Sequence, residues 1–365
     1  MADVLVIGAG VAGCLGARVL AAAGHTVTVV DKGFVPGGRL ASRNVGGATF
    51  DTGAQFLTAK SDHFRAEVAR WQEAGVLRTW FHGSPDLDAP PDPDGYPRFR
   101  GAPTMRRLAE HLATGLDLRL GTIVGAIEPV DGRFRVHTSP RAAGSSSRPV
   151  WPPRNLDAGG SGTPVPTGAS DGPSIRTIDA DAVLLTAPIP QALDVLSAGG
   201  TTIPGPAGAR LRAATYAPTI SVLAVPDGPT GLPERGAIRF PDGDIEWITD
   251  HRVTGASAHP AITIHAGSGF SADHLEAEDG DITSAILAAA SDVLGCRATA
   301  VHVHRWRYAT PTADLGDDDC LIERIDGAPL AFAGDAFTGG RVEGAARSGV
   351  VGAEEIITAL RTTVT

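Results

Sequence analysis

The sequence predicts an α/β protein in which a doubly wound parallel sheet forms one domain and an antiparallel sheet forms the centre of an α+β domain. Near the N-terminus, an apolar run, a glycine turn, an alanine-rich segment and a β-branched run follow one another within residues 3–30, the order of a βαβ unit. Near the C-terminus, the apolar run 330–333 leads through glycines into a helical pattern at 344–360. The chain has 365 residues, enough for two domains.

Composition excludes several classes of protein. The net charge of −10 argues against a nucleic-acid partner, which requires a basic face. The three cysteines, Cys14, Cys296 and Cys320, have neither a disulfide pattern nor zinc spacing, so we expect a cytoplasmic protein without a metal site. The apolar stretch 5–24 is interrupted by Arg18 and several glycines, and we interpret it as a buried strand and helix rather than a signal peptide or membrane span.

The first βα turn carries the sequence GAGVAG at residues 8–13, which is a dinucleotide-binding fingerprint. Its glycines permit a tight turn, a close approach to a diphosphate and close packing of helix on strand. The diphosphate would sit at the helix N-terminus, and Asp31, at the end of the second strand, would bind a ribose. The predicted contacts here are Gly8, Gly10, Val11, Ala12, Gly13, Asp31 and Lys32.

A second motif, GGRLASR at 37–43, is followed by FDTGAQF at 50–56. The glycines bring the backbone close to a ligand, and Arg39 could meet a phosphate or a flavin edge. The alternative is a plain turn with a surface arginine. The predicted contacts are Gly38, Arg39, Asp51, Gly53, Ala54 and Gln55.

A third motif, AGDAFTGGRVEGA at 333–345, lies between a buried strand and a long helix. Asp335 could bind ribityl hydroxyls, and the helix N-terminus could stabilise negative charge on a reduced flavin. The alternative is an ordinary helix that follows a glycine turn. The predicted contacts are Gly334, Asp335, Gly340, Arg341, Val342, Glu343, Gly344 and Ala345.

In the middle of the chain, hydrophobic periodicity and composition are the only signals, and they predict helices, strands and one insertion. A helix is predicted at 104–116 and another at 281–294. Residues 139–174, rich in Ser, Gly, Pro and Ala, are predicted to form a flexible insertion in a surface hairpin. The predicted strands are 118–120, 123–127, 134–138, 175–181, 182–186, 220–225, 237–240, 245–249, 261–266 and 300–308.

Taken together, these motifs resemble the flavin amine oxidase superfamily. Within it, GGRLASR, FDTGAQF, WRYA at 306–309 and AGDAFTGGRVEGA are most similar to the renalase-like proteins. The resemblance implies non-covalent FAD and a backbone contact from Val124 to the adenine side. The chain departs from the renalase-like pattern at Phe34, where an arginine is usual, and at Thr52, where a histidine is frequent. The resemblance also implies two interleaved domains: an FAD domain of residues 1–58, 99–195 and 326–365, and a substrate domain of residues 59–98 and 196–325.

The resemblance also implies a reaction. A substrate C–H bond would give a hydride to flavin N5, and O₂ would reoxidise the flavin to form H₂O₂. Renalase-like proteins suggest isomeric dihydro-NAD(P), a nicotinamide nucleotide, as the small-molecule substrate. Amine oxidation, oxidation of another small metabolite and a non-catalytic FAD sensor remain alternatives. The catalytic residues are not readable, and the candidates on the substrate side are Gln55, Phe56, Trp306, Arg307 and Tyr308, of which Trp306 and Tyr308 could equally be core.

Overall fold

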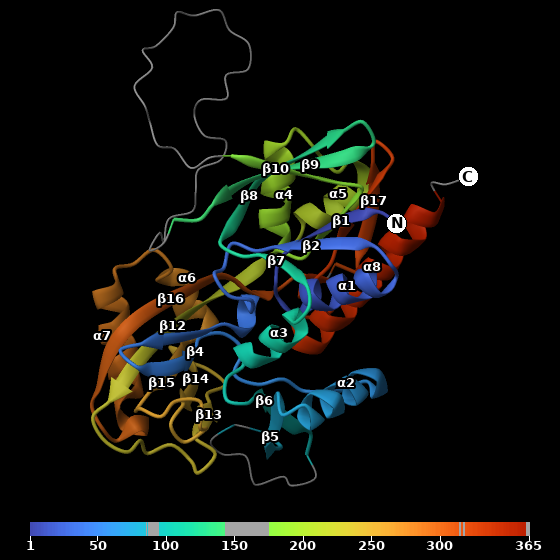
Figure 1. Ribbon diagram of the computed structural model, residues 1–365. Coiled ribbons are helices and arrows are strands. Elements are labelled where there is room, and N and C mark those ends of the chain that lie inside the picture. The colour runs from blue at the N-terminus through green and yellow to red at the C-terminus, as the bar shows by residue number, and fades with distance from the viewer. Residues whose placement is uncertain (85, 87–94, 143–174, 314, 317, 363–365) are drawn as a thin grey trace, which may run out of the picture.

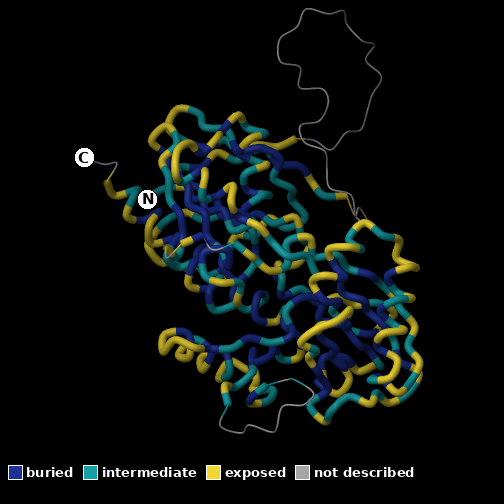
Figure 2. Tube along the Cα trace, turned by 180° about the vertical axis from the view of Figure 1, so that it is seen from behind, coloured by how far each residue is buried: buried dark blue, intermediate teal, exposed yellow. Residues whose placement is uncertain are grey.

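The computed structural model describes residues 1–84, 86, 95–142, 175–313, 315–316 and 318–362. It contains a six-stranded sheet and a five-stranded sheet, each with its own helices (Figure 1). Buried segments run through both sheets (Figure 2). The predicted α/β fold class is confirmed.

The six-stranded sheet has the order β17-β18-β11-β1-β2-β7, and all of its neighbouring strands pair in parallel except β17 and β18. Its strands are β1 (Asp3–Ile7), β2 (Thr26–Val30), β7 (Asp117–Arg119), β11 (Ala182–Leu185), β17 (Leu321–Ile325) and β18 (Ala328–Phe332). Because side chains alternate along a strand, Val4 and Val6 enter one core while Leu5 and Ile7 enter the other.

Helices cover one face of this sheet. They are α1 (Val11–Ala22), α3 (Arg106–Ala113) and α8 (Val342–Thr362). Helices α1 and α8 lie side by side (Figure 1). Their contact is so close that a Cβ at Gly349 would lie 2.1 Å from the carbonyl oxygen of Ala12.

The opposite face is covered by a small antiparallel sheet and two helices. These elements are β8 (Thr122–Val130), β9 (Arg133–Pro140), β10 (Arg176–Ala180), α4 (Ile189–Ala198) and α5 (Gly205–Arg212). Strands β9 and β10 pair, with Thr138 opposite Arg176, as a hairpin requires. The predicted flexible insertion begins at 139, but Ser139 and Pro140 belong to β9 because they pair with β8, and residues 143–174 lie outside the described residues.

The five-stranded sheet is antiparallel, in the order β13-β14-β15-β12-β16. Its strands are β12 (Tyr216–Pro226), β13 (Ala237–Arg239), β14 (Ile245–Asp250), β15 (Ile262–Ala266) and β16 (Ala298–Pro311). One face packs on α6 (Ser268–Asp273) and α7 (Asp279–Leu294). Its other face meets the hairpin formed by β3 (Ser42–Val45) and β4 (Ala48–Asp51).

Several elements were missed or misplaced by pattern reading. No helix or strand was predicted for α2 (Asp62–Glu73), β5 (Leu77–His82), β6 (Pro97–Gly101), β17 or the β3–β4 hairpin. Helix α8 begins at Val342, two residues before the predicted start. Strand β16 extends beyond the predicted 300–308 at both ends, because its whole length pairs with β12. Among the described residues, no helix is long and apolar enough to cross a membrane, and no cluster could hold a metal ion.

Candidate active site

The β1–α1 turn has the geometry of a dinucleotide cradle. Gly8 has φ +117°, and a Cβ at Gly13 would lie 1.8 Å from the carbonyl oxygen of Gly8, so both positions require glycine. Gly10 is the N-cap of α1, and no side chain caps the helix. A Cβ at Gly38 would lie 3.4 Å from the Cα of Gly10, so the first and second motifs meet here. The uncapped N-terminus of α1, which includes Val11 and Ala12, fits a diphosphate.

Asp31 fixes this cradle from the end of β2. Its carboxylate accepts hydrogen bonds from the backbone N–H groups of Ala9, at 2.7 Å, and Gly33, at 2.5 Å. Each carboxylate oxygen keeps a second lone pair that a ribose hydroxyl could use. Lys32, beside it, lies with its Nζ 3.5 Å from Gln191 Oε1.

Val124 lies on β8 close to this end of β2. The N–H of Thr122, two residues earlier, donates to the carbonyl of Asp31 at 2.9 Å. Phe34, which departs from the renalase-like pattern, is an exposed side chain in the same region, and the Cζ of Arg141 lies 5.6 Å from its ring centroid. An arginine from another segment thus lies against an exposed aromatic ring at this position.

The second and third motifs are joined by a bidentate ion pair. Arg39 donates to the two carboxylate oxygens of Asp335 at 2.7 and 2.5 Å, and to the carbonyl of Ala309 at 2.9 Å. The N–H of Gly334 donates to the Oγ of Ser348 on α8 at 2.7 Å. Sequence reasoning assigned Arg39 and Asp335 separately to a cofactor and did not single out Ser348. The structure shows that these groups also hold each other in place.

Asp51 is fully buried, and its side chain is engaged by the protein. Arg100 Nη2 donates to it at 3.0 Å, Ser42 Oγ at 2.6 Å and the Met105 N–H at 3.0 Å. Burial raises the pKa of the Asp51 carboxyl, and Arg100 acts in the opposite direction. Burial also lowers the pKa of Arg100 to about 10. The carboxylate oxygens of Asp51 thus already accept three hydrogen bonds from the protein. A contact from this carboxylate to a cofactor stays a prediction.

Gln55 connects the second motif to the five-stranded sheet. Its Nε2 donates to the carbonyls of Asp51 and Gly53, both at 2.8 Å, and lies 3.1 Å from His265 Nε2. Gly53 leaves no room for a side chain, because a Cβ would lie 2.0 Å from the carbonyl oxygen of Arg39. The N–H of Ala54, the next residue, donates a hydrogen bond to the same carbonyl oxygen of Arg39.

A row of side chains crosses the sheet opposite Gln55. Register places Trp247, His265, Ser221 and His304 side by side on β14, β15, β12 and β16. Burial lowers the pKa of His265 and of His304 to about 4, so both rings are neutral at pH 7. Sequence reasoning treated His304 as a core or surface residue and did not select His265 or Ser221, which only strand pairing brings together.

The three candidates on β16 point to different places. Trp306 Nε1 donates to the carbonyl of Thr52 at 2.7 Å, so this ring faces the second motif. Tyr308 packs edge-on against Tyr216, with the ring centroids 5.6 Å apart. Arg307 is exposed and forms an ion pair with Glu276 at 2.5 Å. Because neighbouring residues of a strand face opposite sides, Arg307 points away from Trp306, and the substrate-side role of these three residues stays a prediction.

Phe56 belongs to an aromatic group, which we define as Phe56, Trp80, Phe81 and Trp247. The centroid of Phe56 lies 5.3 Å from that of Trp247 and 6.5 Å from that of Phe81. Trp80 lies 5.0 Å from Phe81. The group lies next to Gln55 and His265, since Phe56 follows Gln55 in the chain and Trp247 is paired with His265 across the sheet.

The third motif closes the site at the N-terminus of α8. Glu343 accepts hydrogen bonds from the N–H groups of Lys60 and Ser61, each at 2.8 Å. A Cβ at Gly344 would lie 2.2 Å from Thr338 Oγ1. Arg341 is exposed and directly precedes Val342, the first residue of the helix. Gly340 (φ +78°) makes the preceding turn, and Ala345 continues the helix with its N–H on the Arg341 carbonyl.

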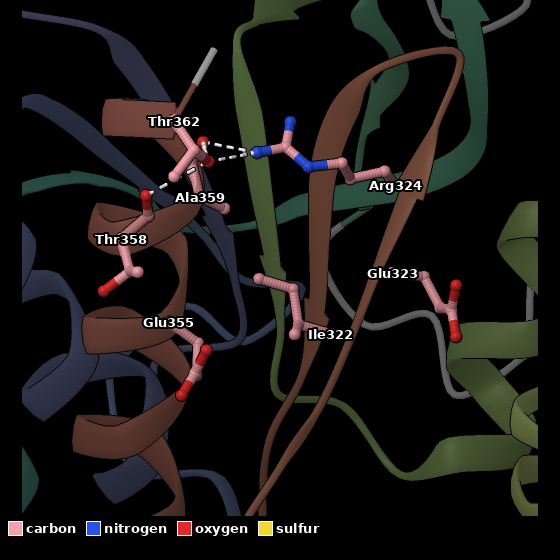
Figure 3. Close-up of a pocket in the computed structure, with 7 residues that line it drawn as sticks. All are labelled: Ile322, Glu323, Arg324, Glu355, Thr358, Ala359 and Thr362. Atoms are coloured by element: carbon pink, nitrogen blue, oxygen red, sulfur yellow. Dashed lines mark hydrogen bonds between the residues drawn. The ribbon is translucent and has the colours of Figure 1, made fainter.

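A surface cavity of about 420 Å³ lies elsewhere, between β17 and the C-terminal end of α8 (Figure 3). Arg324 spans it and donates to the carbonyl of Ala359 at 2.5 Å and to Thr362 Oγ1 at 2.9 Å. A helix of this length places its two ends roughly 30 Å apart. Because the third motif is at the other end of α8, this cavity is not part of the site.

Two family models match the chain. A model described as an NAD(P)-binding Rossmann-like domain matches residues 6–71, and one described as a flavin containing amine oxidoreductase matches residues 97–357. Hydroxyneurosporene desaturase of Rubrivivax gelatinosus is 34% identical over 34% of this chain and 30% of that protein. Putrescine oxidase of Kocuria rosea is 46% identical over 18% of this chain and 14% of that protein. The chain thus spans less than a third of either relative.

Solved structures extend the likeness in fold to 98% of the chain. A putative protoporphyrinogen oxidase from Exiguobacterium sp. 255-15 superposes with a TM-score of 0.65 at 15% identity, over 99% of that chain. A putrescine oxidase bound to putrescine gives a TM-score of 0.67 at 14% identity, also over 99% of that chain. A CLA-producing fatty acid isomerase from P. acnes gives 0.63 at 11%, over 98% of that chain. At such identities these structures show a shared fold.

Proposed function

The chain belongs to the flavin containing amine oxidoreductase family, and from this premise we propose that it oxidises an isomeric dihydronicotinamide nucleotide, a dihydro-NAD(P). As a member of this family it is an oxidoreductase, and FAD is its cofactor. The substrate is the part that we propose.

Residues of the three motifs could hold FAD from its adenosine end to its flavin ring. The N-terminus of α1 would hold the diphosphate, Asp31 the adenosine ribose and the backbone near Val124 the adenine side. The N-terminus of α8 would face the flavin ring. When bound, FAD supplies a hydride acceptor at N5 and passes the electrons on, with O₂ as the proposed acceptor.

The domain division is part of the same proposal. FAD would be held by residues 1–58, 99–195 and a C-terminal segment, with the substrate on the remaining part of the chain. Strand β17 pairs with β18, which supports beginning the C-terminal segment at 321 rather than 326.

One observation carries the choice of substrate: the carboxylates around the site are already engaged. Asp51 is bound by Arg100, Asp335 by Arg39, and Glu343 by two backbone N–H groups. The arginines already balance the charges of Asp51 and Asp335, so of these three carboxylates only Glu343, which is held by neutral N–H groups, could balance the ammonium of an amine. Burying an uncompensated cation is costly.

The other polar groups of the site suit a neutral ring with an amide. His265 is neutral, and its Nε2 lies 3.1 Å from Gln55 Nε2, so the ring could offer one N–H donor and one acceptor nitrogen to a neutral amide. The aromatic group supplies flat surface beside it. A dihydronicotinamide has both a flat ring and a carboxamide, and its oxidation needs no strong base. Oxidation of an amine, which the likeness to putrescine oxidase favours, is the second candidate.

Anaerobic stopped-flow mixing tests the proposal. The holoenzyme is mixed with 2- and 6-dihydro-NAD(P) and, separately, with putrescine, while the flavin absorbance is followed. Fast bleaching by a dihydronicotinamide isomer, without bleaching by putrescine, is the expected result. Bleaching by putrescine alone would establish the second candidate. Bleaching by neither would reject both and favour another metabolite or a non-catalytic sensor.

A further inference from the structure

Thr186 directly follows β11, at the place where the order of the six-stranded sheet reverses. From β1 the chain adds β2 and β7 on one side of the sheet, and it later adds β11 and β18 on the other side. The crevice at the carboxyl ends of β1 and β11 is therefore a topological switch point, where open α/β sheets bind their ligands. Thr186 also lies next to the third motif, since a Cβ at Gly334 would lie 4.0 Å from its carbonyl oxygen.

The hydroxyl of Thr186 contacts the glycine turn of the first motif. Its Oγ1 donates to the carbonyl oxygen of Ile7 at 2.9 Å and lies 3.3 Å from that of Gly8, with which it also forms a hydrogen bond. A Cβ at Gly8 would lie 2.4 Å from this Oγ1, and a Cβ at Gly13 would lie 2.9 Å from it. The first and third glycines of the motif thus leave the space that the Thr186 hydroxyl occupies.

The peptide unit between Gly8 and Ala9 is held at both ends by side chains from neighbouring strands. Its carbonyl oxygen accepts the hydrogen bond from Thr186, after β11. Its N–H donates to the carboxylate of Asp31, after β2, at 2.7 Å. Gly8 has φ +117°, and glycine has more backbone conformations open to it than any other residue, so these two side chains are what fixes the orientation of the unit.

The orientation of this peptide unit matters for binding an anion. A diphosphate lies on the free N–H groups at the start of a helix, and α1 begins at Val11, two residues after Ala9. Rotation of the unit would turn the Gly8 carbonyl oxygen toward the carboxylate of Asp31 and would displace the N–H groups of Val11 and Ala12. The hydroxyl of Thr186 opposes this rotation, because it binds the carbonyl oxygen on the opposite side of the turn.

We propose that Thr186 is a positioning residue for the diphosphate of FAD. It acts through the backbone of the first motif, by holding the carbonyl oxygen of Gly8 on the side of Gly13 and away from Asp31. The α1 N-terminus then keeps the geometry in which its N–H groups can bind the diphosphate. This role depends on FAD, the cofactor of the family, and is independent of the substrate that is oxidised.

The test removes the hydroxyl and keeps the shape of the side chain. Holoenzyme is prepared for Thr186→Val and for Thr186→Ser, which retains the hydroxyl. Thr28→Val is the matched control, because Thr28 lies in the middle of β2 and its Oγ1 donates to Asp117 Oδ2 at 2.9 Å. The Kd of FAD is measured from the fluorescence of flavin released on dilution. The Kd of ADP-ribose, which has the diphosphate without the flavin, is measured from its displacement of FAD.

We expect Thr186→Val to weaken the binding of FAD and of ADP-ribose by the same factor, about tenfold, as for the loss of one hydrogen bond. Thr186→Ser and Thr28→Val should bind both ligands like the wild type. At saturating FAD, the absorbance spectrum of the flavin in Thr186→Val should match that of the wild type, because the change lies at the diphosphate and not at the ring.

Three results would overturn the proposal. The first is a Thr186→Val protein that binds both ligands with the wild-type Kd. The second is weaker binding of FAD with unchanged binding of ADP-ribose, which would place the contact at the flavin end. The third is a lower Tm with both Kd values unchanged, which is the result of a merely structural role. If Thr186→Val does not fold, Thr186→Ala, which is smaller and also lacks the hydroxyl, is measured in its place with the same expected and contrary results.

Discussion

At the scale of single residues, the cofactor cradle requires glycines, which have no side chain, and the proposed substrate side contains histidines that are uncharged. Gly13 leaves room for the carbonyl oxygen of Gly8, and Gly53 leaves room for the carbonyl oxygen of Arg39. His265 and His304 are neutral because their sheet face is buried. Each feature can be tested by a single substitution or by pH.

Gly13→Ala should abolish FAD binding. The added Cβ would lie 1.8 Å from the carbonyl oxygen of Gly8, so α1 must move away from β1 and the diphosphate cradle is lost. We expect a colourless protein that is less stable by about 3 kcal/mol, the upper range for overpacking. Gly280→Ala is the control, because Gly280 also lies in the first turn of a helix but has open space around it. Flavin content and urea denaturation measure both effects, and a yellow Gly13→Ala protein would refute the argument.

The buried histidines should make the protein lose stability at pH values higher than those at which carboxylates are usually protonated. In the unfolded chain a histidine binds a proton near pH 6.5, whereas His265 and His304 bind one only near pH 4. Their contribution to stability is therefore fully present above pH 6.5 and is lost as the pH falls toward 4, by about 1.4 kcal/mol per pH unit for each ring. Urea denaturation at several pH values measures this slope. His265→Gln should make it shallower, and an unchanged slope would show that His265 does not contribute.

At the scale of elements, α8 organises the third motif along its N-terminal half. Glu343 anchors the segment that begins α2, and Ser348 anchors the turn after β18. Gly349 allows α1 to approach. The helix therefore connects the diphosphate end and the flavin end of the proposed cofactor site.

Ser348→Ala should destabilise the turn at Gly334. The Ser348 hydroxyl is buried and accepts the Gly334 N–H at 2.7 Å, so the substitution leaves a buried donor unsatisfied, at a cost of about 1–3 kcal/mol. Because Asp335 is the next residue, FAD affinity should fall as well. Thr358→Ala, on the exposed surface of the same helix, should stay within about 0.5 kcal/mol of the wild type. Thermal denaturation and FAD titration measure both, and equal behaviour of the two variants would contradict the role of Ser348.

At the scale of the whole molecule, the second motif lies between the two large sheets. Thr52 accepts hydrogen bonds from Trp306 and Ser221 of the five-stranded sheet, while Arg39 contacts Asp335 next to the six-stranded sheet. A cofactor held by all three motifs would therefore stabilise both sheets together.

FAD should accordingly raise the stability of the apoprotein in proportion to its binding. Free FAD at 100 times its Kd should add about 2.7 kcal/mol. Tm should then rise by several degrees, in a single transition. Scanning calorimetry of the apoprotein with increasing FAD measures this shift, with FMN, which lacks the adenosine part, as the control. A rise confined to one of two separate transitions would show that the sheets unfold independently.

The three motifs, the fold class and the use of FAD could be read from the sequence, because they depend on local chemistry. A strand, a glycine turn and a helix within residues 3–30 specify the diphosphate cradle, and Asp31 follows at short range. Elements such as α2 and the β5–β6 hairpin could not be read, since their amphipathic faces are completed by contacts with distant segments.

Only the tertiary structure decided which side chains meet. Arg39 and Asp335 are 296 residues apart, Gln55 and His265 are 210 apart, and Trp306 and Thr52 are 254 apart. No local pattern encodes such pairs, because they depend on how strands from separate parts of the chain are ordered in a sheet. The same ordering sends Trp306 toward the site and Arg307 to the opposite face, although the two are adjacent in sequence.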